Sequence, residues 1–233
     1  MNYLICGYHT IKNCILAKKR KVNKIYILDN SKYKKEFNKH NLEEVGKNFF
    51  IKKFSKYDIS HQNIAAEVNG FEKLDFKDEL SKGSIKKIIC LNNVTDIRNI
   101  GSIIRTAAAF GYDSLVISDR IFLESSPVLN KTASGGIDLI NIFSFSNIKY
   151  PIEILIKLNF QIVSLSEKSN EILQPNKIND NHILILGSEN EGINENILKL
   201  SSNIFKININ PKIGSLNVST TCAAAMAVIA QKY

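Results

Sequence analysis

The stretch NIGSIIRTAAAFGY, residues 99–112, decides how the second part of this chain folds. It follows the apolar run 88–91, which predicts a buried strand, and its own apolar residues recur at helical spacing. Gly101 lies where the strand gives way to the helix, and a residue without a side chain lets the backbone approach a ligand closely there. Arg105 follows one turn further along. The stretch therefore predicts a strand–helix unit with an arginine near a ligand site.

Arginine is scarce in this sequence, which carries 31 Lys and Arg but only the four arginines Arg20, Arg98, Arg105 and Arg120. Two of the four lie at or inside the stretch just described. A guanidinium group is planar and permanently charged, which suits recognition of phosphate or carboxylate groups. The alternative is that Arg105 extends its aliphatic part along the helix or pairs with a nearby Asp. Both interpretations remain open at this point.

The bulk properties indicate a packed globular protein of one large or two small domains. The chain has 233 residues, of which 44% are hydrophobic, and no apolar stretch approaches the ~20 residues of a membrane span. The N-terminus lacks the layout of a signal peptide, so we expect a cytoplasmic protein with no membrane partner. The four cysteines and four histidines are scattered, which favours buried free thiols and predicts no metal site.

Positive charge is concentrated in the first part of the chain. Residues 1–83 hold 17 Lys and Arg against 10 Asp and Glu, whereas residues 84–233 hold 14 against 12. One cluster comprises Lys18, Lys19, Arg20, Lys21 and Lys24, and another Lys32, Lys34, Lys35 and Lys39. Such clusters attract polyanions, most often nucleic acid. A lysine-rich composition giving an ordinary solvated surface is the alternative.

The order of apolar runs predicts two α/β domains. We expect a small domain over residues 1–74, a linker over 75–85 and a larger domain over 86–233. The expected strands are 24–28, 49–54 and 64–68 in the first domain and 88–91, 114–117, 140–143, 161–165 and 183–186 in the second. The expected helices are 10–19, 33–40, 102–110, 148–158, 194–200 and 217–231. Strands that alternate with helices in this way favour a parallel sheet covered on both faces.

A second informative stretch is ILILGSENEGIN, residues 183–194. An apolar strand ends at Gly187, and ligands of parallel α/β sheets bind at the carboxyl ends of strands. Glu189 or Glu191 can face a cationic group or cap the next helix. An ordinary strand–loop–helix connection is the alternative.

A third stretch is ININPKIGSLNVSTTCAAA, residues 207–225. Ser215 or Asn217 is a suitable N-cap for the helix that follows. The stretch is either a simple capped helix or a place where backbone amides and the Asn217 amide meet a polar ligand. The small residues of this last helix suit close packing, against a second copy of the chain or against its own sheet.

In this order and spacing the three stretches resemble the SpoU/TrmH family of RNA ribose 2′-O-methyltransferases, within the SPOUT superfamily. They match its Asn–Gly–Arg pattern before an Ala-rich helix, its Gly-x-Glu-x-Glu-Gly pattern and its Ser-Leu-Asn-Val-Ser pattern. KTASGG, residues 131–136, is similar to the family's small-residue turn, and the resemblance covers residues 86–233. LICGYHTIKNCI and HQNIAAEV, near the N-terminus, resemble the substrate-binding domain of the bacterial 23S rRNA guanosine 2′-O-methyltransferase branch.

The chain departs from the family pattern in three places. Asp96-Ile97 stands where many relatives have Asp-Pro, and His61-Gln62-Asn63 stands for His-Gln-Gly. Asn208 and Pro211 occupy places where Pro and Gly are frequent before the third stretch. These changes affect loop shape and leave the matching motif residues in place.

The resemblance implies a trefoil-knotted α/β methyltransferase domain with a parallel sheet, preceded by a small α/β RNA-binding domain. It implies S-adenosylmethionine as cofactor without a metal, a homodimer, and RNA as substrate, with a guanosine of 23S rRNA favoured by the N-terminal domain. The implied catalytic residues are Arg105, Asn99, Glu189 and Asn217, and the implied cofactor-binding residues are Gly187, Ile207, Leu216 and Ser215. The expected RNA-binding residues are Lys18, Lys19, Arg20 and Arg98, with Tyr8, His9 and Tyr33 either stacking on bases or partly buried.

The role of Arg105 has two forms under this resemblance. It either acts as an abnormally deprotonated base or holds RNA phosphate and stabilises the developing alkoxide; its pKa above ~12 in water favours the second. Three other functions remain alternatives: a tRNA 2′-O-methyltransferase of the same family, a non-catalytic RNA-binding ribosome-assembly factor, and a nucleotide-binding Rossmann enzyme. The last lacks a Gly-x-Gly-x-x-Gly motif after the strand at 88–91.

Overall fold

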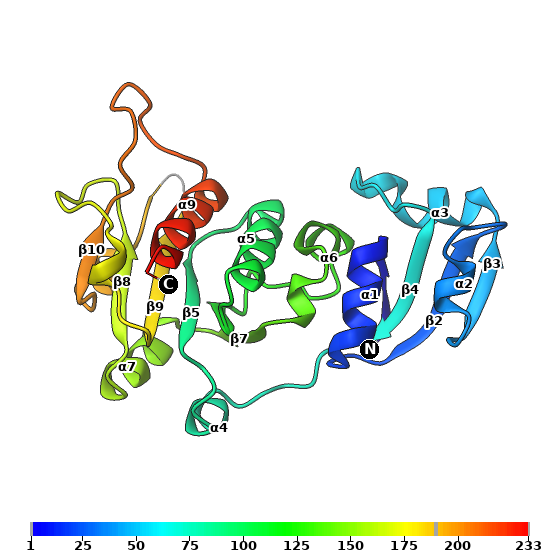
Figure 1. The fold of residues 1–233 in the computed structure, drawn as a ribbon, viewed down its shortest axis with the longest axis horizontal. Coiled ribbons are helices and arrows are strands. Elements are labelled where there is room, and N and C mark those ends of the chain that lie inside the picture. The colour runs from blue at the N-terminus through cyan, green and yellow to red at the C-terminus, as the bar shows by residue number, and fades with distance from the viewer. Residues whose placement is uncertain (1, 189–190, 233) are drawn as a thin grey trace. The chain divides into compact units, whose positions relative to one another are not determined.

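The computed structural model describes residues 2–188 and 191–232 and divides the chain into two compact units. The first unit comprises Met1–Lys73 and Leu123–Leu139, and the second comprises Leu74–Phe122 and Ile140–Tyr233. Figure 1 traces both along the chain. The first unit is therefore built from two separate segments of sequence.

The first unit contains a four-stranded mixed sheet. Its spatial order is β1 (Asn2–Cys6), β4 (Ile64–Asn69), β2 (Val22–Leu28) and β3 (Leu42–Val45). Strand β4 pairs antiparallel with both β1 and β2, whereas β2 and β3 are parallel. Alternate residues of these strands point to opposite faces, so the sheet carries two separate apolar clusters.

Helices cover the two faces of this sheet with different partners. Helices α1 (Tyr8–Ala17) and α2 (Lys34–Phe37) pack on one face, and α3 (Lys47–Phe54) packs on the other. The expected strand at 49–54 is wrong, because Phe50 and Phe54 lie four residues apart and bury one side of a helix. The helix expected at 33–40 is confined to α2.

A buried ion pair joins the two segments of the first unit. The Arg20 guanidinium donates from Nε to Asp138 Oδ1 at 2.8 Å, and both side chains are fully buried. Asn130 accepts a further hydrogen bond from Arg20, and the Phe71 ring lies 4.4 Å from the guanidinium carbon. Burial alone would lower the pKa of Arg20, but the hydrogen bonds and charge of Asp138 raise it, so the guanidinium stays charged. The expectation that Arg20 binds RNA is therefore contradicted, because its donors are used inside the unit.

This pair also explains one difference from the predicted domain boundaries. The segment 123–139 carries helix α6 (Pro127–Ala133) and groups with the first unit. The prediction had ended the first domain at residue 74 and assigned this segment to the second domain. The expected linker at 75–85 contains helix α4 (Phe76–Ser81), whose Phe76 is buried in the core of the second unit.

The second unit contains a six-stranded sheet in which every recorded pair is parallel. Its order is β10 (Asn203–Phe205), β8 (Gln161–Leu165), β9 (His182–Gly187), β5 (Lys87–Asn92), β6 (Ser114–Ser118) and β7 (Asn141–Phe145). The central strands are apolar on both faces, as a doubly covered parallel sheet requires.

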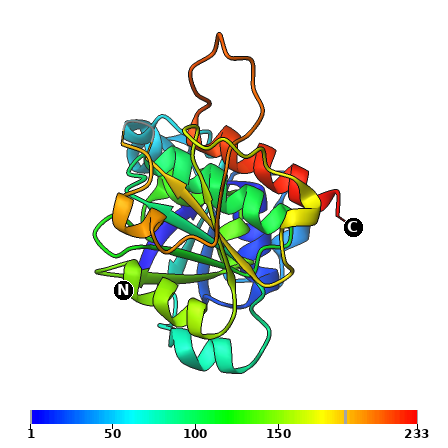
Figure 2. The same cartoon turned by 90° about the vertical axis from the view of Figure 1, so that its left-hand side faces the viewer.

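Helices lie on both faces of the second sheet. Helices α5 (Ile97–Ala109) and α9 (Val218–Ala230) lie side by side on one face (Figures 1 and 2). Helices α4, α7 (Lys149–Lys157) and α8 (Glu195–Leu198) pack into the apolar cluster of the other face. This confirms the expected α/β class with a parallel sheet, whereas the threaded knot stays a prediction.

The order of strands places a ligand site. Strand β5 is followed by β6 and β7 on one side, while β9, β8 and β10 lie on its other side. The strand order thus reverses between β5 and β9, and crevices at such switch points, outside the carboxyl ends of the strands, bind ligands in open α/β sheets.

Candidate functional site

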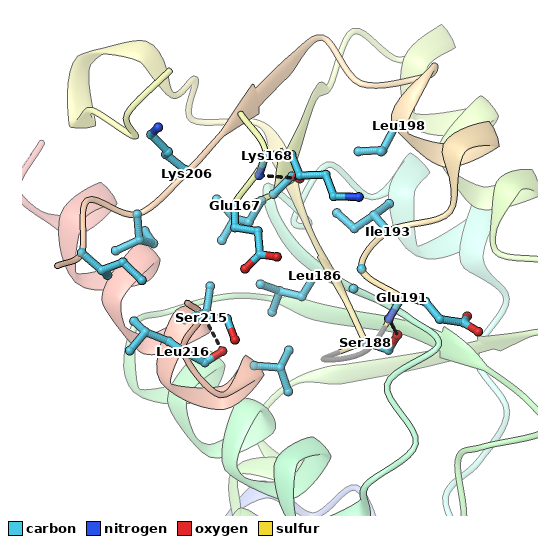
Figure 3. Close-up of a pocket in the computed structure, with 18 of the residues that line it drawn as sticks. Glu167, Lys168, Leu186, Ser188, Glu191, Ile193, Leu198, Lys206, Ser215 and Leu216 are labelled. Carbon is cyan, nitrogen blue, oxygen red and sulfur yellow. Dashed lines mark hydrogen bonds between the residues drawn. The ribbon is translucent and has the colours of Figure 1, made fainter. Parts of the chain in front are cut away.

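A cavity of about 390 Å³ lies at the carboxyl ends of β8 and β9 (Figure 3). Its apolar walls come from Leu165, Leu186, Ile193, Leu198, Ile207, Ile209, Leu216 and Val218. Strands, the loop after β9 and the chain before α9 all contribute to it. Its volume lies in the range of small-molecule and cofactor sites.

A close backbone approach forms one wall of this cavity. A Cβ atom added to Gly187 would lie 2.2 Å from the carbonyl carbon of Gly192 and 2.4 Å from the nitrogen of Ile193. The Gly192 nitrogen donates to the Ser188 oxygen at 2.9 Å, which closes the loop, and Gly192 itself has a φ of 70°. Only glycine at 187 lets the loop fold back this tightly.

A buried asparagine fixes the far side of the same loop. Asn92 ends β5 directly beside Gly187 in the strand register, and it is 5% exposed. Its Oδ1 accepts a hydrogen bond from the Asn194 nitrogen at 2.7 Å. Asn194 in turn caps α8 by accepting from the Asn196 nitrogen. Asn92 was not among the predicted site residues, although a polar residue at the end of an apolar strand was an available signal.

The four residues predicted to bind the cofactor lie together in the cavity lining. Gly187 comes from the end of β9, Ile207 from the chain after β10, and Ser215 and Leu216 from the chain before α9. Gly187 belongs to the second sequence stretch and the other three residues to the third, so their convergence is a result of the fold. That they bind a cofactor stays a prediction.

Two of the predicted catalytic residues touch each other. Asn217 Nδ2 donates to Asn99 Oδ1 at 3.1 Å. Asn217 also caps α9, because its Oδ1 accepts from the Ser219 nitrogen at 2.8 Å. Asn99 lies in the first turn of α5, next to the N-cap Asp96. The contact joins the first and third sequence stretches. The predicted Glu189 lies outside the described residues.

The third predicted catalytic residue, Arg105, is exposed on α5 and does not line the cavity. It lies two turns after Arg98, which is also exposed, so both are on one stripe of the helix. Within residues 2–188 and 191–232, Arg105 forms no ion pair or side-chain hydrogen bond.

Charged side chains surround the apolar walls. Glu167 and Lys168 follow β8, and Glu191, Glu195 and Lys206 complete the set. In Figure 3 the Glu167 carboxylate points into the cavity, whereas the Glu191 carboxylate points away from it. Glu167 was not among the predicted site residues, since nothing in the sequence after β8 distinguishes it from a surface residue.

The residues predicted to meet RNA have mixed surroundings. Lys18 is exposed at the end of α1, whereas Lys19 is half-buried. Tyr8 and Tyr33 are half-buried and stack on each other with ring centroids 5.3 Å apart, and His9 lies edge-on to Tyr8. Base stacking by these rings stays a prediction.

The cavity has the chemistry that S-adenosylmethionine requires. Apolar walls suit a purine, a carboxylate directed inward suits the positive sulfonium or ammonium group, and the Gly187 cradle brings backbone close to the ligand. In the described part of the chain, no group of three or more His, Cys, Asp or Glu side chains is arranged to hold a metal ion. Among the same residues, no helix has both the length and the apolar character needed to cross a bilayer.

Comparison with known proteins assigns a family to this arrangement. The model of the SpoU rRNA Methylase family matches residues 86–227. The 23S rRNA (guanosine-2′-O-)-methyltransferase RlmB of Blochmanniella floridana is 26% identical, covering 94% of this chain and 91% of that protein. An uncharacterized tRNA/rRNA methyltransferase of Synechocystis is also 26% identical; the alignment covers 96% of this chain but 61% of that longer relative.

The fold is shared with a solved structure. The SpoU methyltransferase AviRb of Streptomyces viridochromogenes, crystallised with S-adenosylmethionine, superposes with a TM-score of 0.80. The match covers 99% of this chain and 90% of that chain at 16% sequence identity. At this identity the likeness shows the fold.

Proposed function

The chain belongs to the SpoU rRNA Methylase family, and on that ground we propose that it transfers the methyl group of S-adenosylmethionine to a ribose 2′-hydroxyl of RNA. One observation carries the proposal: Gly187 of the second sequence stretch lines one cavity together with Ile207, Ser215 and Leu216 of the third. A cytoplasmic location and a homodimer are part of the proposal. The homodimer is included because Arg105 lies outside the cavity lining, so that a second copy of the chain can complete the site.

Within this proposal the cavity residues hold the cofactor. Backbone groups at Gly187, Ile207 and Leu216 bind the adenosine, and the inward carboxylate of Glu167 faces the positive end of the molecule. S-adenosylmethionine supplies a methyl group on a positively charged sulfur, which is open to in-line attack. The protein's task is then alignment of the attacking oxygen.

The exposed helix residues act on the RNA. Arg105 binds phosphate and stabilises the negative charge that develops on the 2′-oxygen, which a permanently charged guanidinium does better than it accepts a proton. Asn99 and Asn217 hold each other and thereby fix the start of α9 against α5. Glu189 is proposed as a fourth member of this group.

We favour a guanosine of 23S rRNA as the substrate. The relative from Blochmanniella floridana aligns along both units of this chain, including the first unit that would select the RNA. A tRNA substrate is the second candidate, because other relatives carry the broader name tRNA/rRNA methyltransferase. A non-catalytic assembly factor would bind the same RNA without transferring a methyl group.

Labelled S-adenosylmethionine tests these alternatives directly. The protein is incubated with 23S rRNA transcript or with tRNA, and the label is mapped by nuclease digestion. We expect label on one ribose of 23S rRNA, and its loss in Arg105→Ala. Label on tRNA would overturn the substrate, and cofactor binding without transfer to either RNA or to ribosomal precursors would overturn the activity.

A further inference from the structure

The face of the first unit covered by α3 carries positive charge without acidic neighbours in the chain. Lys47, Lys52, Lys53 and Lys56 are all exposed, and no Asp or Glu occurs from residue 47 to residue 57. We call this surface, with Ile51, the α3 face. Its lysines were not part of the clusters singled out by the sequence.

Three lysines elsewhere in the first unit are paired with carboxylates. Glu36 lies 3.2 Å from the Lys12 ammonium, Lys24 pairs with Glu43, and Lys34 pairs with Glu44. In the described part of the chain, none of the four lysines of the α3 face forms an ion pair. The four lysines therefore give the α3 face exposed positive charge that no ion pair offsets among the described residues.

Two acidic groups of the sheet beneath α3 are engaged by side chains other than these four lysines. Alternation along β3 and β4 directs Glu43 and Glu67 to the same side of the sheet as α3. Glu43 is held by Lys24, and Glu67 accepts a hydrogen bond from Asn2 Nδ2 at 2.9 Å. Asp58, the next acidic residue along the chain, follows the last lysine by two positions.

Helix stability explains only part of the charge. Lys52 and Lys53 lie in the last turn of α3, where cations favour the helix dipole. Lys47 is the first residue of α3, where a cation opposes the dipole, and the Gly46 N-cap offers no side-chain cap. Lys56 lies beyond the helix, over the Tyr57 ring at 4.9 Å. Helix stability therefore does not explain Lys47, and Lys56 contributes a cation–π contact rather than a helix-dipole interaction.

An apolar side chain lies among these lysines. Ile51 is 58% exposed, whereas Phe50 and Phe54 of the same helix are buried against the sheet. Cations around an exposed aliphatic group match the alternation of phosphate with sugar and base along an RNA strand. The surface thus has both kinds of contact that a nucleic acid uses.

We propose that the α3 face is the surface by which the first unit binds the phosphate backbone of the RNA substrate. This inference rests on the proposed function for the identity of the RNA. The proposed surface differs from the predicted one at residues 18–20, where Arg20 is buried. That cluster follows α1, which packs on the face of the sheet opposite α3.

Two variants of equal charge change test the inference in the full chain. Lys52→Ala/Lys53→Ala/Lys56→Ala removes three charges from the α3 face, and Lys32→Ala/Lys35→Ala/Lys39→Ala removes three exposed charges around α2, on the other face. RNA affinity is measured on 23S rRNA transcript at several salt concentrations. We expect the first variant to bind about tenfold more weakly or worse and to lose ~2–3 from the salt slope, with the second close to wild type.

The outcomes separate this inference from the proposed activity. Equal losses in both variants, no loss in the first, or no RNA binding by the wild type would overturn the α3 face. Circular dichroism and S-adenosylmethionine affinity are expected to be unchanged in both variants, because all six lysines are exposed. If the wild type binds RNA through the α3 face but transfers no methyl group, the activity fails and the surface stands.

Discussion

Arg20 and Arg105 have the same side chain, which is rare in this sequence, but their surroundings are opposite. Arg20 is buried against Asp138, Asn130 and Phe71, and every contact it makes is internal to the first unit. Arg105 stands on the exposed stripe of α5 without an ion pair in the described part of the chain. The scarcity of arginine drew attention to both, but only burial separates a residue that holds the fold together from one available to a ligand.

Breaking the buried pair tests the structural half of this contrast. Asp138→Asn leaves the Arg20 charge buried without a counter-charge, and the first unit is expected to lose ~3–5 kcal/mol of unfolding free energy. Denaturant titration monitored within the first unit measures the loss. The matched control Arg20→Met/Asp138→Leu removes both charges and is expected to recover most of it. A loss below ~1 kcal/mol in Asp138→Asn would show that the pair does not hold the segments together.

Removing the exposed arginine tests the other half. Arg105→Ala is expected to lower the rate of methyl transfer by ~10²–10³, as removal of one group that stabilises a developing oxyanion does. The free energy of unfolding should stay within ~0.5 kcal/mol of wild type, because the side chain is exposed. Arg105→Lys separates charge from shape, since an ammonium keeps the charge but not the fork. Full activity in Arg105→Ala would contradict the assignment, and so would a large loss of stability.

Gly187 tests a position where folding and binding coincide. In Gly187→Ala the new Cβ meets the backbone of Gly192, so the loop has to shift. We expect a loss of ~1–3 kcal/mol of stability, typical of overpacking, together with weaker S-adenosylmethionine binding in calorimetry. Gly214→Ala is the control in the neighbouring loop, because open space surrounds a Cβ there. Equal cofactor affinity in both variants would show that the Gly187 loop does not shape the cavity.

The buried His182 gives a further prediction, with a smaller expected effect on stability. His182 is 1% exposed, and its Nε2 lies 2.9 Å from the Tyr112 hydroxyl. Burial lowers the pKa of His182, so the neutral form is the one the fold accepts. Its contribution to stability is present above the ordinary pKa of ~6.5 and declines as the pH falls below that value.

Unfolding measured across pH 5 to 8 in wild type and His182→Gln checks this prediction. The pH dependence below ~6.5 should be weaker in the variant, because the titrating group is gone. An unchanged pH dependence would assign the effect to other groups.

The second unit was largely predictable because its signals are local. Apolar runs such as 183–186 and the Ala-rich last helix indicate element type directly, and β9 and α9 lie where they were expected. The convergence of the sequence stretches was also predictable, since the carboxyl ends of parallel strands meet at one edge of the sheet. The hydrogen bond between Asn99 and Asn217 joins residues 118 positions apart, which only the fold brings together.

The first unit was predicted less well for two physical reasons. FFIKKF, residues 49–54, contains β-favouring aromatics, and the four-residue spacing of Phe50 and Phe54 outweighed that propensity. Arg20 looked like part of a basic surface because its partner, Asp138, is 118 residues away. No local pattern distinguishes a basic residue that reaches solvent from one that meets a distant carboxylate.

The split composition of the first unit has a consequence for synthesis of the chain. Asn130 and Asp138 leave the ribosome well after residues 2–73 have been made, so the nascent first segment holds Arg20 before its partners exist. The buried Arg20 contacts can form only after much of the second unit's sheet has been translated, because β5 and β6 intervene in the chain. Amino-terminal domains usually fold first during translation, whereas here the buried ion pair of the amino-terminal unit forms only after part of the second unit has been made.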